Sequence, residues 1–457
     1  MSNDALSDLD AAPAHALAAA IAGGRLGARE ACERAIARIE RRDGALNAVV
    51  VRDFERARAQ ADRADQALAR GERRPLLGVP MTVKESYDVA GLPTTWGLPP
   101  FRDHRPTADA VAVARLKAAG AVILGKTNVP PALADWQCAN PIYGRTVHPL
   151  DHARTPGDSS GGAAAALASG MVPLELGSDI GGSIRVPAAF CGVFGHKPTY
   201  GLVPARGHGF PGTDGAEVAL AVCGPLARSA ADLELALGVV AGPDVDRADG
   251  WALSLPAPPA QLAGTRLLAL DAHPCARTQR AIAGTVAHVA RLASAAGAGV
   301  DRESPLLPDL AGAHEAYQRL LTPIVTRGAP NPGPIISAHE WMAALDEQLR
   351  AQRRWRALFE HYDAVVTPAF GTVAYPYVEE QSFAARTLTI DGEVTAYGDQ
   401  LAWPGVATFP GLPATVAPLG ATSDGLPIGL QVIGPAWHDR RTIAIAGWLH
   451  ALARPPA

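Results

Sequence analysis

A regular alternation of apolar strand-like segments with amphipathic helical segments constrains the fold of this chain most. Residues 28–39 place apolar side chains three to four positions apart, as one face of a helix requires. Further along, an apolar strand at 76–83, a helix at 109–119 and a strand at 121–124 follow one another. Strands that alternate with helices form layered sheets, because each helix covers one face of the sheet. The sequence therefore predicts an α/β fold.

Composition narrows the class of protein. With 48% hydrophobic and 19% charged residues over 457 positions, the chain is able to bury a large core. A net charge of −4 gives no electrostatic basis for nucleic-acid binding. No apolar run approaches the roughly 20 residues of a membrane-spanning helix, and the acidic N-terminal stretch does not resemble a signal peptide. We expect no nucleic-acid and no membrane partner.

The cysteines and histidines point to a reducing compartment without a metal centre. Five cysteines are an odd number and form no CxxC pair, which is typical of a cytoplasmic protein without disulfide or zinc frameworks. His148 and His152 lie four positions apart, but a proline between them disfavours the helix that a metal-binding pair of this spacing needs. We expect no metal and no cofactor.

Two glycine-rich serine motifs are the densest chemical feature. Ser159 lies in TPGDSSGG, just before an Ala-rich helix at 162–168 whose first N–H groups are free and carry a partial positive charge. Ser183 follows 24 positions later in GSDIGGSIRVP. Successive N–H groups in the run 180–183 form a concavity suited to an oxyanion, if the glycines adopt the required dihedral angles. The alternative is that both motifs are merely flexible loops.

Lysine is rare in this chain, so each lysine is informative. Of 41 Lys and Arg residues only four are Lys: Lys84, Lys117, Lys126 and Lys197. Lys84 ends the apolar strand, where burial would lower its pKa and leave a neutral amine that accepts a proton. A lysine at a strand end is also commonly a surface charge. Lys117 fits an ordinary helix surface, and Lys126 and Lys197, each before a loop, remain unassigned.

At these residues the chain resembles the amidase signature family of serine hydrolases. The matching stretches are GVPMTVKESYDVAGLPTTWG around Lys84, TPGDSSGG at Ser159, GSDIGGSIRVP at Ser183, GPLARSAADL, FPGLPATVAPLG and DGLPIGLQVIGP. The resemblance spans about 45–446 and is weak between about 250 and 360. It implies an α/β/α layered single domain with a large mixed central sheet. Residues 1–70 would form a helical segment packed on a core of 71–457, with a variable, mainly helical region at about 255–360.

The resemblance also implies a role for each motif residue. Ser183 would be the acylating nucleophile, Ser159 the bridging serine after a cis peptide bond, and Lys84 the base. The amides of Ile180, Gly181, Gly182 and Ser183 would form the oxyanion hole, and Ser160, Asp179 and Arg185 would support the site. Leu133, Ala134, Asp135 and Trp136 would line the substrate path. The expected activity is hydrolysis of a small-molecule carboxylic acid amide, by a possible homodimer.

The sequence departs from the family pattern next to the bridging serine. Asp158 stands where the family commonly has glycine, and its carboxylate would either raise the pKa of Lys84 or contact a cationic substrate. Smaller departures are Glu85 for Asp, His148 for Asn, Ser178 for Thr and Ala163 for Ser. Trp96 and Phe210, with Leu133 and Trp136, suggest a partly aromatic substrate pocket.

Three other readings of the chain stay open. The run Gly157–Gly161 also fits G-x-S-x-G, so Ser159 would be the nucleophile of an α/β-hydrolase with His438 as base; an elbow of that kind needs a preceding apolar strand. The chain could instead be the glutaminase subunit of a tRNA-dependent amidotransferase. A non-catalytic member retained for binding is the third reading, and the presence of Lys84, Ser159 and Ser183 argues against it.

Overall fold

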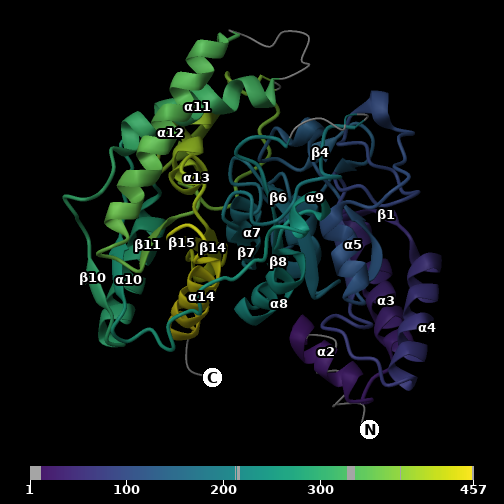
Figure 1. The fold of residues 1–457 in the computed structure, drawn as a ribbon. Helices are drawn as coiled ribbons and strands as arrows, with labels where there is room; N and C mark the ends of the chain where they lie inside the picture. Colours follow the sequence, from purple (N-terminus) through teal and green to yellow (C-terminus); the bar gives the residue numbers. More distant parts are fainter. Residues whose placement is uncertain (1–11, 212, 214–216, 327–334, 381, 455–457) are drawn as a thin grey trace.

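The fold of this computed structural model is built on one large sheet (Figure 1). The structure describes residues 12–211, 213, 217–326, 335–380 and 382–454. Its strands are β1 Val49–Arg52, β2 Pro80–Lys84, β3 Val122–Thr127, β4 Ala139–Asn140, β5 Gly144–Arg145, β6 Leu174–Asp179, β7 Phe194–Lys197, β8 Val222–Ala227, β9 Arg266–Ala269, β10 Gly299–Asp301, β11 Ala364–Pro368, β12 Thr387–Ile390, β13 Glu393–Ala396, β14 Ala414–Ala421 and β15 Pro427–Ile433. Its α-helices are α2 Ala14–Ala22, α3 Ala28–Leu46, α4 Phe54–Ala69, α5 Val111–Ala118, α6 Gly161–Ala168, α7 Arg185–Cys191, α8 Ala230–Val240, α9 Val245–Ala248, α10 Arg280–Ala295, α11 Leu310–Val325, α12 Ala338–Leu358, α13 Ala402–Thr408 and α14 Asp439–Ala453.

The central sheet is mixed. Its eleven strands run in the order β1-β3-β2-β6-β8-β7-β14-β15-β11-β9-β10. The pairs β3–β2, β2–β6, β11–β9 and β9–β10 are parallel, and the pairs from β6 through β8, β7, β14 and β15 to β11 are antiparallel. The predicted α/β class with a large mixed sheet in a single domain is confirmed.

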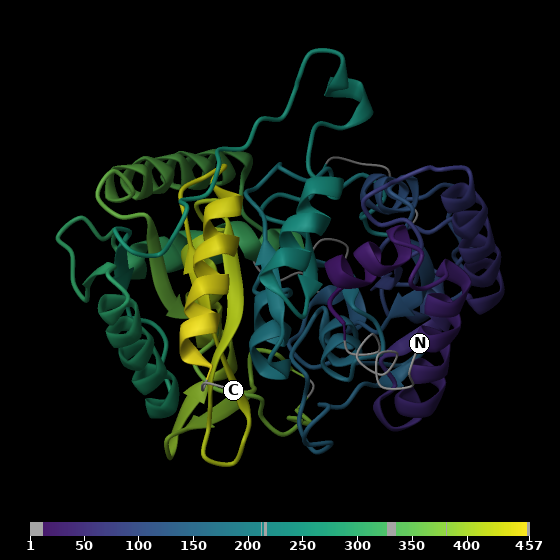
Figure 2. The ribbon, with the colours of Figure 1, turned by 90° about the horizontal axis from the view of Figure 1, so that it is seen from below.

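Helices cover both faces of this sheet, as adjacent residues of β14 show. The hydroxyl of Thr415 lies 2.9 Å from that of Thr442 on α14. The next residue, Val416, points to the opposite face, because successive side chains of a strand alternate. There, a Cβ added at Gly429 would meet both Val416 and Ala189 of α7. α14 and α7 therefore sandwich this part of the sheet, and Figure 2 shows α14 running along its strands.

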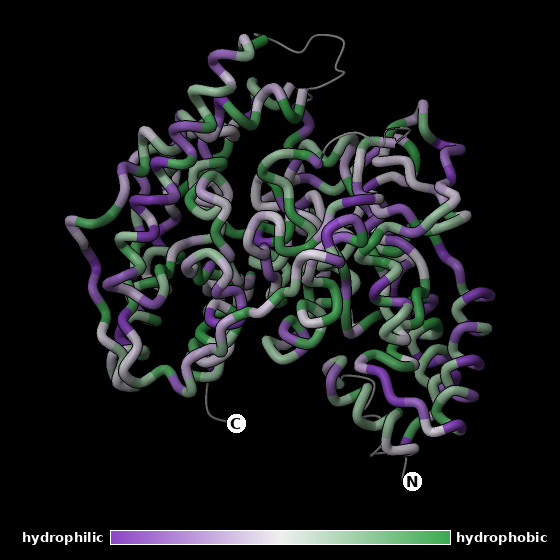
Figure 3. Tube along the Cα trace, viewed as in Figure 1, coloured by the Kyte–Doolittle hydropathy of each residue, from purple (hydrophilic) through white to green (hydrophobic). Residues whose placement is uncertain are grey.

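Two groups of helices lie at opposite ends of the sheet (Figures 1 and 2). At one end are α2, α3 and α4, and at the other α10, α11 and α12. Figure 3 shows hydrophilic residues on these outer helices and apolar ones through the central elements. On α12 the arginines Arg353, Arg354 and Arg356 are all exposed, so they form a solvated face of the helix.

Most predicted elements form within a few residues of their expected bounds, but one strand is shorter. The predicted strand at 76–83 begins only at Pro80, because residues 76–79 turn beneath α3 with Gly78 at a φ of +83°. A Cβ at Gly78 would come within 2.6 Å of the Ala28 Cβ, so only glycine allows this close approach. The strand still ends at Lys84. The glycine- and proline-rich stretches 255–264 and 328–334 predict surface loops. Residues 255–264 form such a loop, and residues 328–334 lie outside the described residues.

Candidate active site

Lys84 ends a strand that is buried along its whole length. All five residues of β2 are buried, and the Lys84 side chain is inaccessible to solvent. Its Nζ donates to Ser159 Oγ at 2.7 Å, to Ser178 Oγ at 2.9 Å and to the Ser178 carbonyl at 3.4 Å. Burial lowers the pKa of Lys84 to about 8, against the opposing charges of Asp158 and Asp179. A large fraction of this amine is therefore neutral near pH 8.

The two serine motifs meet at the start of α6. The Asp158–Ser159 peptide is cis, and Ser160 is the N-cap residue of the helix. The Ser160 N–H donates to the Ser183 carbonyl at 3.0 Å, and the Ser160 Oγ lies 3.4 Å from both the carbonyl and the amide of Ser178. Ser183 is 4% exposed, and its hydroxyl makes no hydrogen bond to any described residue. One helix start thus joins the Lys84 environment to the loop that carries Ser183.

The glycines of the first motif let α6 approach the sheet. A Cβ at Gly162 would lie 2.3 Å from the Asn128 backbone nitrogen and 2.9 Å from the Ala48 carbonyl oxygen. Such a contact is sterically impossible, so a side chain here would push the helix away from β1 and β3. The four alanines that follow directly, 163–166, are fully buried. Small residues in this motif therefore set the distance between the helix start and Lys84.

Every carbonyl of the loop at 180–183 is held by a donor. The Ile180 carbonyl accepts the Tyr317 hydroxyl at 2.7 Å, and the Gly181 carbonyl accepts the Trp136 Nε1–H at 2.9 Å. The Gly182 carbonyl accepts an amide of α7, and the Ser183 carbonyl accepts that of Ser160. Of the four amides, Gly182 donates to Asp179 Oδ1 at 2.9 Å. The other three amides bond to no acceptor in the described part of the chain, so their N–H groups are available as donors.

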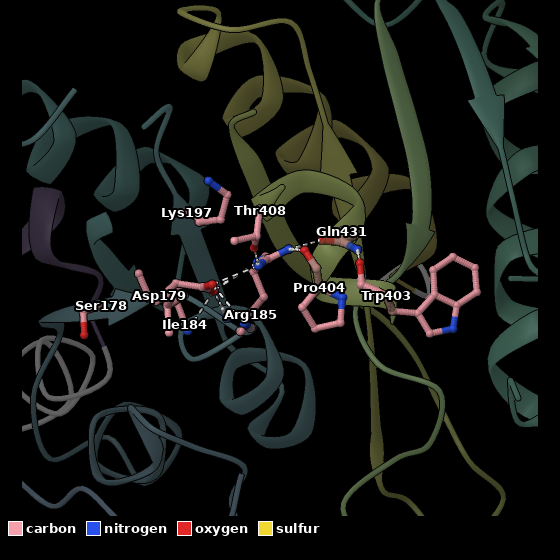
Figure 4. Close-up of polar contacts among 12 residues, drawn as sticks. Ser178, Asp179, Ile184, Arg185, Lys197, Trp403, Pro404, Thr408 and Gln431 are labelled. Atoms are coloured by element: carbon pink, nitrogen blue, oxygen red, sulfur yellow. Dashed lines mark hydrogen bonds and ion pairs between the residues drawn. The ribbon is translucent and has the colours of Figure 1, made fainter. Parts of the chain in front are cut away.

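A buried ion pair anchors this loop from below (Figure 4). Arg185 binds Asp179 through two parallel bonds, Nη2 to Oδ1 at 2.8 Å and Nε to Oδ2 at 3.0 Å. Although burial opposes ionisation, the Arg185 charge holds the pKa of Asp179 down at about 2. The remaining guanidinium donors reach the Pro404 carbonyl, Thr408 Oγ1 and Gln431 Oε1. All polar groups of the pair are satisfied, which is what a buried pair requires to be tolerated.

Asp158, the departure from the family pattern, is completely buried. Its Oδ1 accepts the Gly161 N–H at 2.5 Å, at the first turn of α6. Its Oδ2 has no hydrogen-bond partner among the described residues. Burial raises the pKa of Asp158 well above its usual range. Burial thus favours the neutral form of this carboxyl, and the nearby Lys84 charge opposes that shift.

The segment predicted to line the substrate path is largely engaged in internal contacts. Trp136 is 3% exposed, and its ring packs against Phe370 and Tyr397. Asp135 pairs with Arg386 at 2.6 Å and accepts the Tyr397 hydroxyl at 2.9 Å. Leu133 is partly exposed with a φ of +59°, and Ala134 is exposed. Their contact with substrate stays a prediction.

A second aromatic group lies beyond the end of β2. The Trp96 ring lies 5.7 Å from that of Phe210 and 5.4 Å from that of His208, measured between ring centroids. His208 also lies 2.9 Å from Ser86 Oγ, two residues after Lys84. The predicted proximity of Trp96 and Phe210 is thus realised, and their contact with substrate stays a prediction.

The structure separates His438 from this centre. The charges that act on His438 are those of Arg441 and Asp439, at the start of α14, and of Asp363, just before β11. Ser159 instead accepts a bond from Lys84, and no strand lies between β5, which ends at Arg145, and α6. The elbow of an α/β-hydrolase needs a strand at that place, so the pairing of Ser159 with His438 does not form.

Sequence reasoning missed two features of the site. Tyr317 comes from α11, in the region where the family resemblance is weak, and no motif marked it. Lys126 and Lys197 proved fully buried, with pKa values lowered by burial to about 8 and about 7. Each lies at the end of a short strand, β3 or β7, and that position by itself does not determine whether a lysine is buried.

Comparisons with known proteins agree with this geometry. The amidase family profile matches residues 30–266 and 281–443, so the chain belongs to the amidase family. It is 36% identical over 474 residues to AmiB2 of Mycobacterium tuberculosis H37Rv, covering 98% of this chain and 97% of the relative. It is 35% identical over 450 residues to the 1-carboxybiuret hydrolase subunit AtzE of Pseudomonas sp. ADP, covering 92% and 94%. Both alignments run nearly end to end.

A solved structure extends the comparison to three dimensions. A chain from the solved structure of a vestigial protein complex, described as revealing the evolutionary origins of an s-triazine catabolic enzyme, superposes with a TM-score of 0.83 at 31% identity. The match covers 96% of this chain and 98% of that one. The protein is accordingly an amidase that hydrolyses C–N amide bonds. None of the helices that the structure describes has the length and apolar character that crossing a membrane requires.

Proposed function

We propose that this amidase cleaves a small-molecule carboxylic acid amide through an acyl-enzyme on Ser183, with Lys84 as base and Ser159 as the bridging group. The observation that supports this most directly is the 2.7 Å bond between Lys84 Nζ and Ser159 Oγ, deep in the protein. A neutral buried amine beside a hydroxyl is a competent base near neutral pH. The bond from Ser160 to the Ser183 carbonyl keeps the second serine beside this pair.

In the proposed acylation, protons move along the two hydroxyls toward Lys84. Neutral Lys84 takes the Ser159 proton while Ser159 takes the Ser183 proton, and the Ser183 Oγ attacks the amide carbonyl carbon. The tetrahedral intermediate collapses as the C–N bond breaks, and Lys84 returns the proton through Ser159 to the leaving nitrogen. A water then attacks the ester by the same relay, releasing the acid and Ser183. Lys84 and Ser159 therefore end the cycle in the protonation states in which they began it.

The oxyanion would be held by backbone amides of the 180–183 loop. The amides of Ile180, Gly181 and Ser183 are the ones without a protein acceptor, whereas that of Gly182 is bonded to Asp179. Donors that are already oriented stabilise the developing charge without further reorganisation. We therefore assign Gly182 to anchoring the loop and the other three amides to the oxyanion. The 180–183 loop and the start of α6 are held in place relative to each other by Asp179, Arg185 and Ser160.

Covalent labelling tests this assignment. A fluorophosphonate probe should modify Ser183, located by peptide mass spectrometry, and Ser183→Ala should abolish both labelling and hydrolysis. Ser159→Ala should retain the fold and lose most activity. Labelling at Ser159, with Ser183→Ala still active, would overturn the proposal.

Substrate class is tested by a hydrolysis panel of aryl, short aliphatic, long-chain and amino-acid amides. The aromatic group around Trp96 and Phe210 supports preference for an aryl or apolar acyl part. Release of ammonia from glutamine alone, dependent on a co-purifying partner, would instead identify the glutaminase subunit. The five free thiols of the chain agree with a cytoplasmic site of action.

A further inference from the structure

We infer that Tyr317 is a positioning residue for amide hydrolysis: its hydroxyl fixes the peptide plane that aims the Gly181 amide at the oxyanion. This inference rests on the proposed function, since it needs the 180–183 loop to be the oxyanion hole. Tyr317 lies on α11, 137 positions from the Ile180 carbonyl that its hydroxyl binds at 2.7 Å.

Peptide geometry connects that carbonyl to the next amide. In a planar trans peptide, the carbonyl of one residue and the N–H of the next point in opposite directions. Fixing the Ile180 carbonyl toward Tyr317 therefore directs the Gly181 N–H away from it. Gly181 has no side chain to restrict its φ and ψ, so this plane would otherwise rotate readily. One hydrogen bond from α11 thus sets the direction of one oxyanion donor.

The Gly181 and Gly182 amides differ in what fixes the direction of the N–H group. The Gly182 N–H already donates to Asp179, within the signature segment itself. The Gly181 N–H bonds to no acceptor among the described residues, and the Tyr317 hydroxyl oxygen lies only 3.6 Å from where a Gly181 Cβ would stand. The Gly181 amide therefore depends on a side chain that the signature motifs do not contain.

The Tyr317 ring is itself fixed in place. The side chain is fully buried in an apolar cluster with Leu320, Leu321 and Phe409. α13 packs so tightly on it that a Cβ at Gly405 would come within 2.8 Å of the ring. Burial also raises the pKa of Tyr317, so the hydroxyl remains a protonated donor throughout the working pH range. A rigid donor is what positioning a loop requires.

The experiment compares Tyr317→Phe with Tyr362→Phe. Each change removes the hydroxyl of a tyrosine whose side chain is largely buried and keeps the ring; the Tyr362 hydroxyl binds Asp301 Oδ2 at 2.8 Å, away from the site. We expect Tyr317→Phe to lower kcat roughly 10- to 100-fold, because a misdirected oxyanion donor costs transition-state stabilisation. KM and the pH dependence of kcat should stay unchanged. Tyr362→Phe should change kcat less than twofold.

Melting temperature and Ser183 labelling separate the outcomes. A fall in kcat for Tyr317→Phe beyond that of Tyr362→Phe, at a comparable melting temperature, supports the inference. A kcat within twofold of wild type, or an equal loss in both variants, overturns it. If the inference about Tyr317 fails but the probe labels Ser183 in the wild-type protein, the proposed function is still supported. Failure to label Ser183 would contradict the proposed function itself.

Discussion

Lys84 and Lys126 occupy neighbouring strands and share the same burial, yet their surroundings differ. Both side chains are inaccessible to solvent, and burial lowers the pKa of each to about 8. In the β2–β3 register Lys84 pairs with Thr127 and Lys126 with Val83, so the two lysines point to opposite faces of the sheet. Lys84 reaches the hydroxyls of Ser159, just before α6, and of Ser178, in β6. Lys126 reaches the Pro93 carbonyl and the Thr94 hydroxyl.

This contrast shows that a depressed pKa does not by itself make a catalytic base. Burial supplies a neutral amine at either position, but only Lys84 has a hydroxyl whose neighbours lead on to Ser183. Lys126 instead contacts the segment after β2, where its Nζ donates to the Pro93 carbonyl and the Thr94 hydroxyl. The face of the sheet on which each lysine lies decides which partners it meets. The two positions therefore form a matched pair for experiments.

The largest expected effect comes from replacing the amine that must lose a proton. Lys84→Arg keeps a positive charge, but guanidinium stays protonated in proteins, so we expect kcat to fall at least about 10³-fold. Lys126→Met, as control, should keep kcat per folded molecule within about threefold, measured well below its melting temperature. Full activity in Lys84→Arg, or an equal loss in Lys126→Met, would break the distinction between the two lysines.

The second prediction concerns the pH dependence of kcat/KM. Below pH 8 the ammonium form of Lys84 dominates, and each unit of pH removes about a factor of ten of the neutral base. Activity should therefore rise with pH and level off above about pH 8. The same rise with pH should persist in Lys126→Met, although burial lowers the pKa of Lys126 to about 8 as well. If the rise of activity with pH disappeared in Lys126→Met, it would report the titration of Lys126 and not that of Lys84.

A smaller effect is expected from the hydroxyls that each ammonium contacts. Ser178→Ala removes an acceptor at 2.9 Å from Lys84 Nζ, which should lower kcat by about tenfold. Loss of that acceptor destabilises the ammonium form and lowers the pKa of Lys84. The rise of activity with pH should therefore occur at lower pH. Thr94→Val removes the equivalent acceptor, at 2.8 Å from Lys126 Nζ, and should leave kcat and the pH dependence of activity unchanged. Equal effects of the two changes would contradict the assignment.

The smallest effect is expected at Lys117, the partly exposed lysine. It pairs with Asp109 at 2.8 Å, with 27% and 21% of the two side chains exposed. Pairs of this kind contribute little, so Lys117→Ala should lower the free energy of unfolding by less than about 1 kcal/mol. Chemical denaturation would measure this, and kcat should not change. A larger loss would show that exposure is a poor guide to the role of a lysine in this chain.

Local sequence was sufficient to predict much of the site. The Ala-rich helix after Ser159 and the end of the strand at Lys84 follow from residue type and spacing, because both are short-range properties. The start of that strand was less predictable: residues 76–79 are as apolar as the strand itself, and only the close packing of Gly78 on α3 makes them a turn. Lys126 and Lys197 could not be ranked, because any strand end leaves burial undetermined.

The sequence by itself determined the fold class, the two serine motifs and the choice of Lys84 as candidate base, since these depend on patterns within short segments. Only the tertiary structure decided which amides of the 180–183 loop have no protein acceptor, and that Trp136 and Tyr317 hold two of its carbonyls. Those contacts join residues that are 45 and 137 positions apart. Their geometry depends on how α11 and the segment before Trp136 pack on the sheet, which no local pattern specifies.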